Sequence, residues 1–313
     1  MLQPCTTAWV ESPLQLLGAI EHAALTADDG RRRIAVLPRA GEAQLERTAA
    51  IVHERGLPAG IAIGIERRLL PWVRFAPSAE WLVGDPFSGQ VQARLARAVP
   101  RRLTLVDDGA ITRRLAALLA DGHPLLRPSR RTGDRVPALR RTLAATTTRT
   151  LRELAGEGRL DVTTYLAPDD PAVLALTALG ALVRHHDFAW TRANGFAAAD
   201  VPPSRRIVLG TAAVADGAVP ADEHLAMVVA LARSGPLAYL PHRREPEWLL
   251  RVLERERHVS VVPARVPVEF ALGGATRPLE IVSRPSSALE TLERVLAGTG
   301  SRILLADPQA VGS

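Results

Sequence analysis

Residues 103–119 read LTLVDDGAITRRLAALL, and this stretch decides the fold. Its first four residues, Leu103 to Val106, have the length and aliphatic composition of a buried β-strand. The acidic turn Asp107-Asp108-Gly109 follows directly, and the apolar spacing after it predicts a helix from Ile111 to Leu119. A strand, a turn and a helix in this order form the repeating unit of a parallel α/β sheet.

The same unit recurs along the whole chain, and a small, polar, proline-rich segment at 194–203 separates two halves. We therefore predict two Rossmann-like α/β domains with parallel sheets facing a central cleft, an N-terminal domain over 1–195 and a C-terminal domain over 204–313. Strands are expected at Thr6–Val10, Arg33–Leu37, Ile61–Ile65, Glu80–Val83, Leu103–Val106, Asp161–Leu166, Arg206–Leu209, Leu237–Leu240, Val259–Val262, Leu279–Val282 and Arg302–Leu305. A helix after the sixth strand is expected to end near His185.

All 39 basic residues are arginine, because the sequence contains no lysine. This excludes Schiff-base chemistry and a P-loop lysine, and with them pyridoxal enzymes and P-loop nucleotide hydrolases. Such a composition is typical of GC-rich DNA and needs no functional reason. Arginine nevertheless binds phosphates and carboxylates through paired hydrogen bonds, so the net charge of +6 favours anionic substrates.

The sequence predicts a cytoplasmic protein. Cys5 is its single cysteine, so it has no internal disulfide and no cysteine metal cluster. Glu11 interrupts the basic-then-apolar order of a signal peptide. The longest uncharged run, Pro171 to Val183, is shorter than the roughly 20 residues of a membrane span. Any membrane contact is expected to be peripheral, at the inner face.

Eight arginines gather between Arg127 and Arg152, in a segment expected to be a loop followed by a helix. The ordinary explanation is a solvated basic face. The functional alternative is a surface that attracts an anionic acceptor or an anionic membrane. Nucleic acid is not an expected partner, because no aromatic residues interleave with these arginines and no nucleic-acid-binding motif is present.

The turn Asp107-Asp108-Gly109 is the first candidate site. It follows a strand and precedes a helix, and open α/β sheets bind their ligands at the carboxyl ends of their strands. A carboxylate in that place is suited to act as a general base. The same turn is also a common helix cap that would need no catalytic role.

Two further candidates lie in the second half. The stretch Pro241-His242-Arg243-Arg244-Glu245 follows a strand, and a histidine flanked by arginines is suited to hold a phosphate. The stretch Ser283-Arg284-Pro285-Ser286-Ser287 leads into a helix, whose free amides and neighbouring hydroxyls can cradle a phosphate. A loop histidine without a role and an ordinary serine cap are the respective alternatives.

The pair His185-His186 with Asp187 suggests a metal site only weakly. Neighbouring residues on a helix point apart, and no third ligand stands at a suitable spacing. We therefore predict no metal. The motifs Gly-x-Gly-x-x-Gly and Gly-x-Ser-x-Gly are absent, which removes the usual support for dinucleotide binding and serine hydrolysis.

In their order, these motifs resemble those of the bacterial sialyltransferases and polysialyltransferases, namely an acidic pair with glycine, a His-Pro-type motif and a serine-rich motif. Glu11-Ser12-Pro13-Leu14-Gln15-Leu16-Leu17 also resembles the Ser/Thr-Pro-Leu-Gln opening of the lipooligosaccharide sialyltransferase and polysialyltransferase-like families, and Gly84-Asp85 resembles their next loop. Pro241–Glu245, Pro267–Glu269 and Ser286–Leu289 are similar to their donor half. The resemblance spans nearly the whole chain.

The resemblance implies a GT-B fold and an inverting transfer of a sialic acid, or a related nonulosonic acid, from a CMP-sugar to a glycan hydroxyl. It implies no metal and no other cofactor. Asp107 would be the catalytic base, and Asp108 and Gly109 would support its loop.

On the donor side, the resemblance implies that His242 binds the departing CMP phosphate with help from Ser286 and Ser287. Glu269 would accept hydrogen bonds from the ribose hydroxyls. Arg243 departs from the pattern, because the His-Pro form has proline there. Further residues expected at the acceptor and donor cleft are Ser12, Gln15, Asp85 and Arg243.

Two alternatives stay open at this point. Motifs that contact CMP say little about the sugar, so another CMP-sugar such as Kdo fits them equally well. A non-catalytic α/β protein that binds or assembles surface polysaccharide would need these turns only as helix caps.

Overall fold

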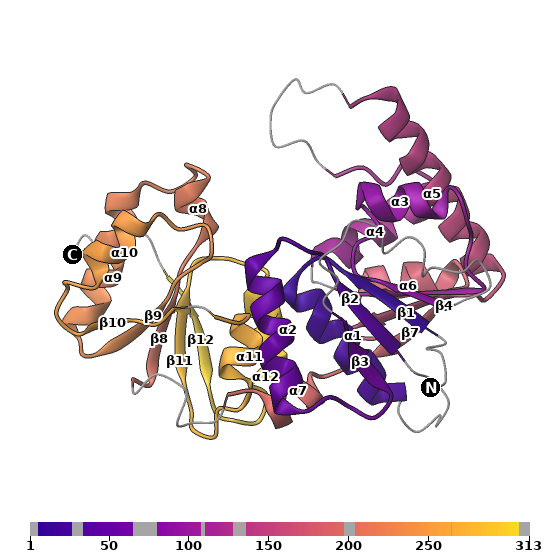
Figure 1. The fold of residues 1–313 in the computed structure, drawn as a ribbon. Coiled ribbons are helices and arrows are strands. Elements are labelled where there is room, and N and C mark those ends of the chain that lie inside the picture. The colour runs from indigo at the N-terminus through magenta and orange to yellow at the C-terminus, as the bar shows by residue number, and fades with distance from the viewer. Residues whose placement is uncertain are drawn as a thin grey trace. The chain divides into compact units, whose positions relative to one another are not determined.

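The computed structural model describes residues 6–26, 34–64, 80–107, 110–127, 136–196, 204–263 and 265–306. The chain divides into two compact units, Met1–Trp190 and Thr191–Ser313, each built on one parallel β-sheet (Figure 1). The predicted linker lies outside the described residues from 197 to 203. The prediction of two Rossmann-like parallel sheets is confirmed.

Unit 1 contains a seven-stranded sheet in the order β3-β2-β1-β4-β5-β6-β7. Its strands are β1 Thr6–Val10, β2 Ile34–Pro38, β3 Ile61–Ile63, β4 Glu80–Val83, β5 Arg102–Val106, β6 Leu160–Thr164 and β7 Leu182–His185. Its helices are α1 Pro13–Thr26, α2 Ala43–Arg55, α3 Gly89–Leu95, α4 Ala110–Ala120, α5 Ala138–Gly156 and α6 Pro171–Ala178, and α7 Ala189–Asn194 spans the division between the units. Strands β1, β4 and β6 are buried along their whole length, as expected for parallel strands covered on both faces.

Unit 2 contains a five-stranded sheet in the order β10-β9-β8-β11-β12. Its strands are β8 Arg206–Leu209, β9 Leu237–Leu240, β10 Val259–Val261, β11 Glu280–Ser283 and β12 Arg302–Leu305. Its helices are α8 Ala212–Ala215, α9 Ala221–Arg233, α10 Glu247–Leu253, α11 Val268–Gly273 and α12 Ala288–Val295. Aliphatic side chains of β8, β9, α9 and α10 form its core around the fully buried Tyr239.

The predicted helix ending near His185 is wrong at its end, because α6 stops at Ala178 and residues 182–185 form strand β7. Gly180 has a φ of 93°, a left-handed conformation that suits glycine and allows the chain to turn from helix to strand. β7 is the edge strand of its sheet, and both of its ends are exposed. It therefore lacks the buried apolar run by which the other strands were predicted.

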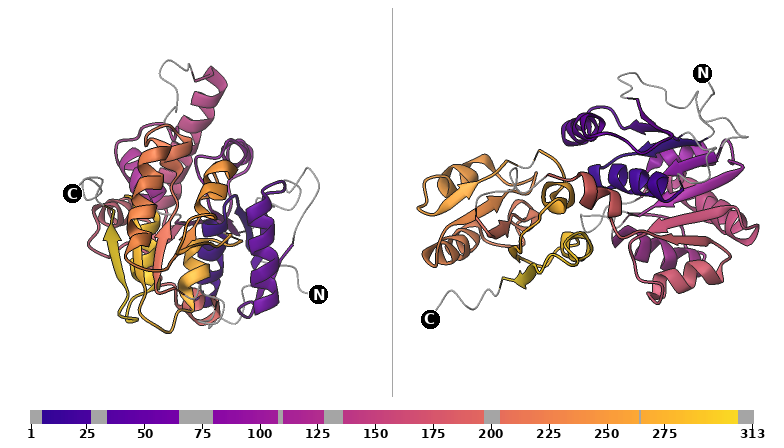
Figure 2. Two further views of the ribbon diagram at one scale, coloured as in Figure 1. Left: turned by 90° about the vertical axis from the view of Figure 1, so that its left-hand side faces the viewer. Right: turned by 90° about the horizontal axis from the view of Figure 1, so that it is seen from below.

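The strand orders place a topological switch point in each sheet. From β1 the chain continues to β2 on one side, whereas β4 pairs on the other side, and in unit 2 β8 has the same position between β9 and β11. Right-handed crossovers in opposite directions place helices on both faces of such a sheet (Figure 2). Open α/β sheets bind ligands at the carboxyl ends of the strands at these points.

Candidate functional site

Asp107 follows β5 directly and is only 4% exposed. Its backbone N–H donates to the Thr163 carbonyl at 2.9 Å, which continues the pairing of β5 with β6. Two hydroxyls hold its carboxylate: Thr112 on α4 donates to Oδ1 at 2.6 Å, and Thr164 at the end of β6 donates to Oδ2 at 2.5 Å. The structure thus places this carboxylate at the carboxyl edge of the first sheet, between side chains from two elements.

The backbone of the same turn packs closely on α1. A Cβ atom at Gly18 would lie 3.3 Å from the Asp107 carbonyl oxygen and 3.4 Å from the Val106 Cβ, so the glycine allows this approach. The other two residues of the predicted motif, Asp108 and Gly109, lie outside the described residues.

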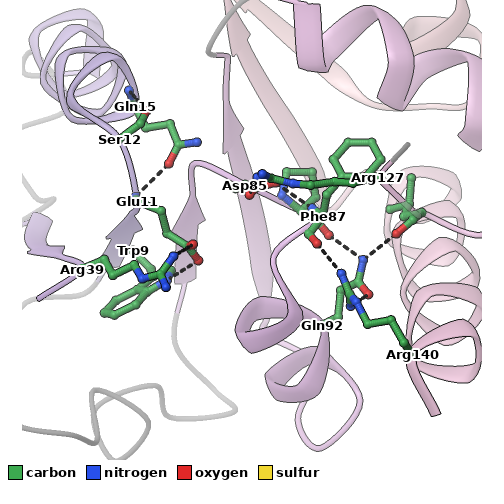
Figure 3. A network of polar contacts seen from close by, with 12 residues as sticks. Trp9, Glu11, Ser12, Gln15, Arg39, Asp85, Phe87, Gln92, Arg127 and Arg140 are labelled. Atoms are coloured by element: carbon green, nitrogen blue, oxygen red, sulfur yellow. Dashed lines mark hydrogen bonds and ion pairs between the residues drawn. The ribbon is translucent and has the colours of Figure 1, made fainter. Parts of the chain in front are cut away.

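Ser12 lies directly before α1, and Gln15 lies in its first turn (Figure 3). The Gln15 N–H donates to the Ser12 hydroxyl at 3.2 Å, and the Gln15 side-chain oxygen accepts from the Glu11 N–H at 2.8 Å. This reciprocal pair closely resembles a capping box, which stabilises a helix N-terminus. Gln15 also packs against Gly84 of the β4 loop, where an added Cβ would overlap its side chain. Both predicted cleft residues therefore have structural roles at the switch point.

Glu11 was not predicted as a site residue, but it joins two strand ends. Its carboxylate accepts from the Trp9 indole N–H at 3.0 Å and pairs with Arg39, which follows β2, at 3.2 Å. Sequence alone offered no signal for this, because Arg39 is 28 residues away.

Asp85 follows β4 and is 1% exposed. Its Oδ1 accepts from the Phe87 N–H at 2.9 Å, and its Oδ2 pairs with the Arg127 guanidinium (Figure 3). Burial raises the pKa of the Asp85 carboxyl, although the charge of Arg127 opposes this shift. The pair ties the β4 loop to the beginning of the arginine-rich segment.

Arg140, in the first turn of α5, also binds inward to this loop. It donates to the Phe87 carbonyl at 2.5 Å and to the Gln92 side-chain oxygen (Figure 3). Burial lowers the pKa of its guanidinium. Arg127 and Arg140, two of the arginines expected to form an anion-attracting surface, thus bind the protein itself, and residues 128–135 of that segment lie outside the described part of the chain.

His242 lies in the loop after β9 and is half-buried. Its Nδ1 accepts from the Arg244 N–H at 3.2 Å, so the neutral ring carries its proton on Nε2. Burial lowers the pKa of His242, and the charge of Arg243 lowers it further. The ring is therefore suited to donate an Nε2–H hydrogen bond to an anion. Arg243 itself is exposed beside it.

Glu245 was quoted with the His242 stretch but was not predicted to have a role. It is 8% exposed, and its carboxylate accepts from the N–H of Thr211 and of His242, both at 2.9 Å, and from the Tyr239 hydroxyl at 2.6 Å. Burial raises the pKa of the Glu245 carboxyl, and these three donors oppose the shift. A glycine directly after a strand, Gly210, was the available signal for a close approach here.

Glu269 contacts the first turn of α12, and the two predicted serines directly precede that helix. Glu269, 4% exposed in the first turn of α11, accepts from the Thr291 hydroxyl of α12 at 2.5 Å, and burial raises the pKa of its carboxyl. Ser286 and Ser287 are exposed just before α12, and Ser287 makes no side-chain capping bond. The hydroxyls are thus open to a ligand, whereas the Glu269 carboxylate is enclosed by protein.

His185 and His186 do not act as a pair. His185 Nδ1 bonds to the Leu166 carbonyl at 2.8 Å, whereas His186 is buried against Phe188 with ring centroids 4.6 Å apart. Burial lowers the pKa of His186 to about 4, so the ring is neutral near pH 7. Among the described residues, no three His, Cys, Asp or Glu side chains are grouped as metal ligands would be.

No protein-family model matches the sequence, and no curated protein matches it either. Among solved structures, the chain is similar to Medicago truncatula UGT71G1 complexed with UDP-glucose, with a TM-score of 0.51 and 11% identity over 96% of this chain and 85% of that chain. It is similar to a Polygonum tinctorium UDP-glucosyltransferase capable of glucosylating indoxyl, with a TM-score of 0.50 and 12% identity over 99% and 82% of the two chains. It is also similar to Phytolacca americana UGT2, with a TM-score of 0.50 and 10% identity over 97% and 80%.

These similarities establish the fold. The chain has the GT-B fold, in which two Rossmann-like α/β units are joined in one polypeptide, as the sequence predicted. None of the described helices combines the length and the hydropathy needed to cross a bilayer.

Proposed function

We propose that this protein is a nucleotide-sugar glycosyltransferase that moves a sialic acid, or a related nonulosonic acid, from a CMP-sugar to a glycan hydroxyl with inversion and without a metal. The observation that carries the proposal is Asp107, a buried carboxylate at the carboxyl edge of the first sheet that accepts hydrogen bonds from two threonine hydroxyls. The GT-B fold supports a nucleotide-sugar donor, since a similar structure is complexed with UDP-glucose. The ordered motifs support CMP as the nucleotide.

In the proposed reaction, an acceptor hydroxyl oxygen attacks the anomeric carbon while the bond from that carbon to the CMP phosphate oxygen breaks. Asp107 takes the proton of the hydroxyl, and CMP leaves with the electron pair of the broken bond. Attack from the face opposite the leaving group inverts the anomeric centre. As Asp107 gains its proton, one of the hydroxyls of Thr112 and Thr164 can turn and accept a hydrogen bond while the other still donates, so the carboxyl keeps both partners.

On the donor side, negative charge builds on the phosphate as the bond breaks. His242 supports this charge through its Nε2–H, and the exposed hydroxyls of Ser286 and Ser287 add donors. Loss of one such donor costs on the order of 10²-fold in rate. For Glu269 to bind the ribose hydroxyls, its carboxylate must exchange the Thr291 hydroxyl for the ligand.

The test measures release of CMP from a panel of CMP-sugars, including CMP-Kdo, by the purified full chain in the presence of chelator. We expect slow release by hydrolysis and faster release with an acceptor glycan, while UDP-glucose serves as the control donor. Preference for CMP-Kdo would correct the sugar alone. Strict dependence on metal, or binding of CMP-sugars without release of CMP, would overturn the proposed reaction.

A further inference from the structure

We propose that Glu245 is a positioning residue that holds the loop of His242, and with it the Nε2–H that faces the donor phosphate. The role of His242 in this inference rests on the proposed function. The role of Glu245 rests on contacts within unit 2 alone.

The Glu245 carboxylate joins two loops at the carboxyl edge of the second sheet. Oε1 accepts from the Thr211 N–H, which follows β8, and Oε2 accepts from the His242 N–H, which follows β9, both at 2.9 Å. The loop also closes on itself, since the Glu245 N–H donates to the His242 carbonyl at 2.9 Å. Two of these bonds close the loop of residues 242–245 on itself, and the bond from Thr211 fixes that loop to the end of β8 at the switch point of this sheet.

Hydrogen atoms in the buried side of this cluster can be assigned by counting donors. Tyr239 has one hydroxyl hydrogen and donates it to Glu245 at 2.6 Å. The 2.8 Å contact between Tyr239 and His224 Nε2 must then be a bond donated by the histidine. His224 Nδ1, which has no hydrogen-bond partner among the described residues, is left without a proton. A chain of donors thus runs from His224 through Tyr239 to Glu245, and its end must be an acceptor.

The packing around Glu245 leaves no room for a side chain at Gly210. A Cβ atom at Gly210 would overlap both the Glu245 carboxylate and the His242 backbone nitrogen. Glycine at this position therefore allows the two loops to approach within hydrogen-bonding distance. The same loop sets the ring of His242, because the Arg244 N–H donates to Nδ1 at 3.2 Å and leaves the proton on Nε2.

A carboxylate is required because every group around it donates. In Glu245→Gln, either orientation of the side-chain amide sets its NH₂ group against a backbone N–H, that of Thr211 or that of His242. The loop should then detach on one side. Tyr239→Phe removes one donor but leaves both backbone bonds, so its effect should be smaller.

The experiment compares Glu245→Gln and Tyr239→Phe with Glu247→Gln, an exposed glutamate paired only with Arg251 among its described contacts. In CMP release we expect kcat to fall by about 10- to 100-fold in Glu245→Gln and by about threefold in Tyr239→Phe, with KM for the acceptor unchanged. Glu247→Gln should behave as the wild type. Melting temperatures show whether each variant folds.

A second readout needs no activity. The ¹⁵N signals of His242 should show a protonated Nε2 and an unprotonated Nδ1 in the wild type and a mixture of the two tautomers in Glu245→Gln. An unchanged kcat, or an unchanged His242 tautomer, in a folded Glu245→Gln protein overturns the inference. If that variant does not fold, wild-type kinetics and wild-type His242 signals in Tyr239→Phe overturn it instead. If the wild type releases no CMP, the proposed function fails while the His242 signals still test the anchor.

Discussion

Asp107 in unit 1 and Glu245 in unit 2 are both buried carboxylates beside the carboxyl end of a parallel strand, but different donors hold them. Two threonine hydroxyls donate to Asp107. Two backbone N–H groups and one tyrosine hydroxyl donate to Glu245. A hydroxyl can turn and accept a hydrogen bond, whereas a backbone N–H can only donate.

This difference indicates which carboxylate can change its protonation during a reaction. A proton on Asp107 can be accommodated, because a threonine hydroxyl that donated can accept instead. A proton on Glu245 would face an N–H that has no such freedom. Asp107 is therefore suited to act as a base, and Glu245 is suited to act as an anchor.

The largest expected effect comes from Asp107→Asn, which tests whether Asp107 acts as the catalytic base. The amide cannot take a proton, so transfer should fall by about 10²- to 10⁴-fold. The fold should tolerate the change, because the hydroxyls of Thr112 and Thr164 can bond to either end of the amide. Initial rates at saturating substrates and calorimetric CMP binding check both statements.

The control for this variant is Asp121→Asn, an exposed aspartate after α4, which should keep the wild-type rate. Normal transfer by Asp107→Asn would show that the catalytic assignment is wrong. If that variant unfolded, Asp107 would be needed for the structure, as Glu245 is, and the proposed difference between the two carboxylates would be wrong.

Two buried histidines, one in each unit, allow the two units to be compared by how their stability responds to low pH. Within the part of the chain that the structure describes, His186 in unit 1 has no hydrogen-bond partner on either ring nitrogen, whereas His224 in unit 2 bonds to Tyr239. Burial lowers the pKa of each to about 4; Asp187 opposes the shift at His186, and Arg284 adds to it at His224. In the unfolded chain each histidine takes up a proton near pH 6.5, whereas in the folded protein it does so only near pH 4. The free energy of unfolding therefore falls as the pH drops from about 6.5 to about 4, by about 3 kcal/mol for each histidine.

Urea unfolding between pH 7 and pH 5 measures this effect. His186→Phe and His224→Phe should each reduce the loss of stability over that range by about 2 kcal/mol, since neither ring can then take up a proton. A profile as steep as that of the wild type in either buried variant would contradict the prediction for that unit.

Much of the fold could be predicted because buried parallel strands are continuous apolar runs. The run Leu103–Val106 predicts β5 and places Asp107 at the end of that strand. β7 was missed because an exposed edge strand of four residues has no such run. The pattern of apolar residues along a sequence indicates which elements are buried, so it does not predict an element that is only partly buried.

The partners of the candidate residues could not be predicted, because they come from distant parts of the chain. Thr164 lies 57 residues from Asp107, and Thr211 lies 34 residues from Glu245. Local sequence shows which residues follow a strand. Only the strand order brings β6 beside β5 and β8 beside β9, so the donors that distinguish the two carboxylates appear only in the folded structure.

The smallest expected effect comes from two glycines, one packed against a side chain and the other packed against a backbone nitrogen as well. An added Cβ at Gly84 would overlap the Gln15 side chain, whereas one at Gly210 would overlap the His242 backbone nitrogen and the Glu245 carboxylate. A side chain can move aside more easily than a backbone. We therefore expect Gly84→Ala to cost about 1 kcal/mol of unfolding free energy and Gly210→Ala about 2 kcal/mol.

Urea unfolding gives these costs, and hydrogen exchange shows where protection is lost. Gly156→Ala, at the end of α5 with no atom within 4 Å of the new Cβ, is the matched control and should be neutral or stabilising. Loss of protection in Gly210→Ala should centre on residues 241–245, because that loop must move. Equal costs for Gly84→Ala and Gly210→Ala would mean that the unit 2 loop yields as easily as a side chain. The backbone amides of that loop could then move when the protonation of Glu245 changes. Glu245 would in that case be as free to take up a proton as Asp107, and the distinction between the two carboxylates would be lost.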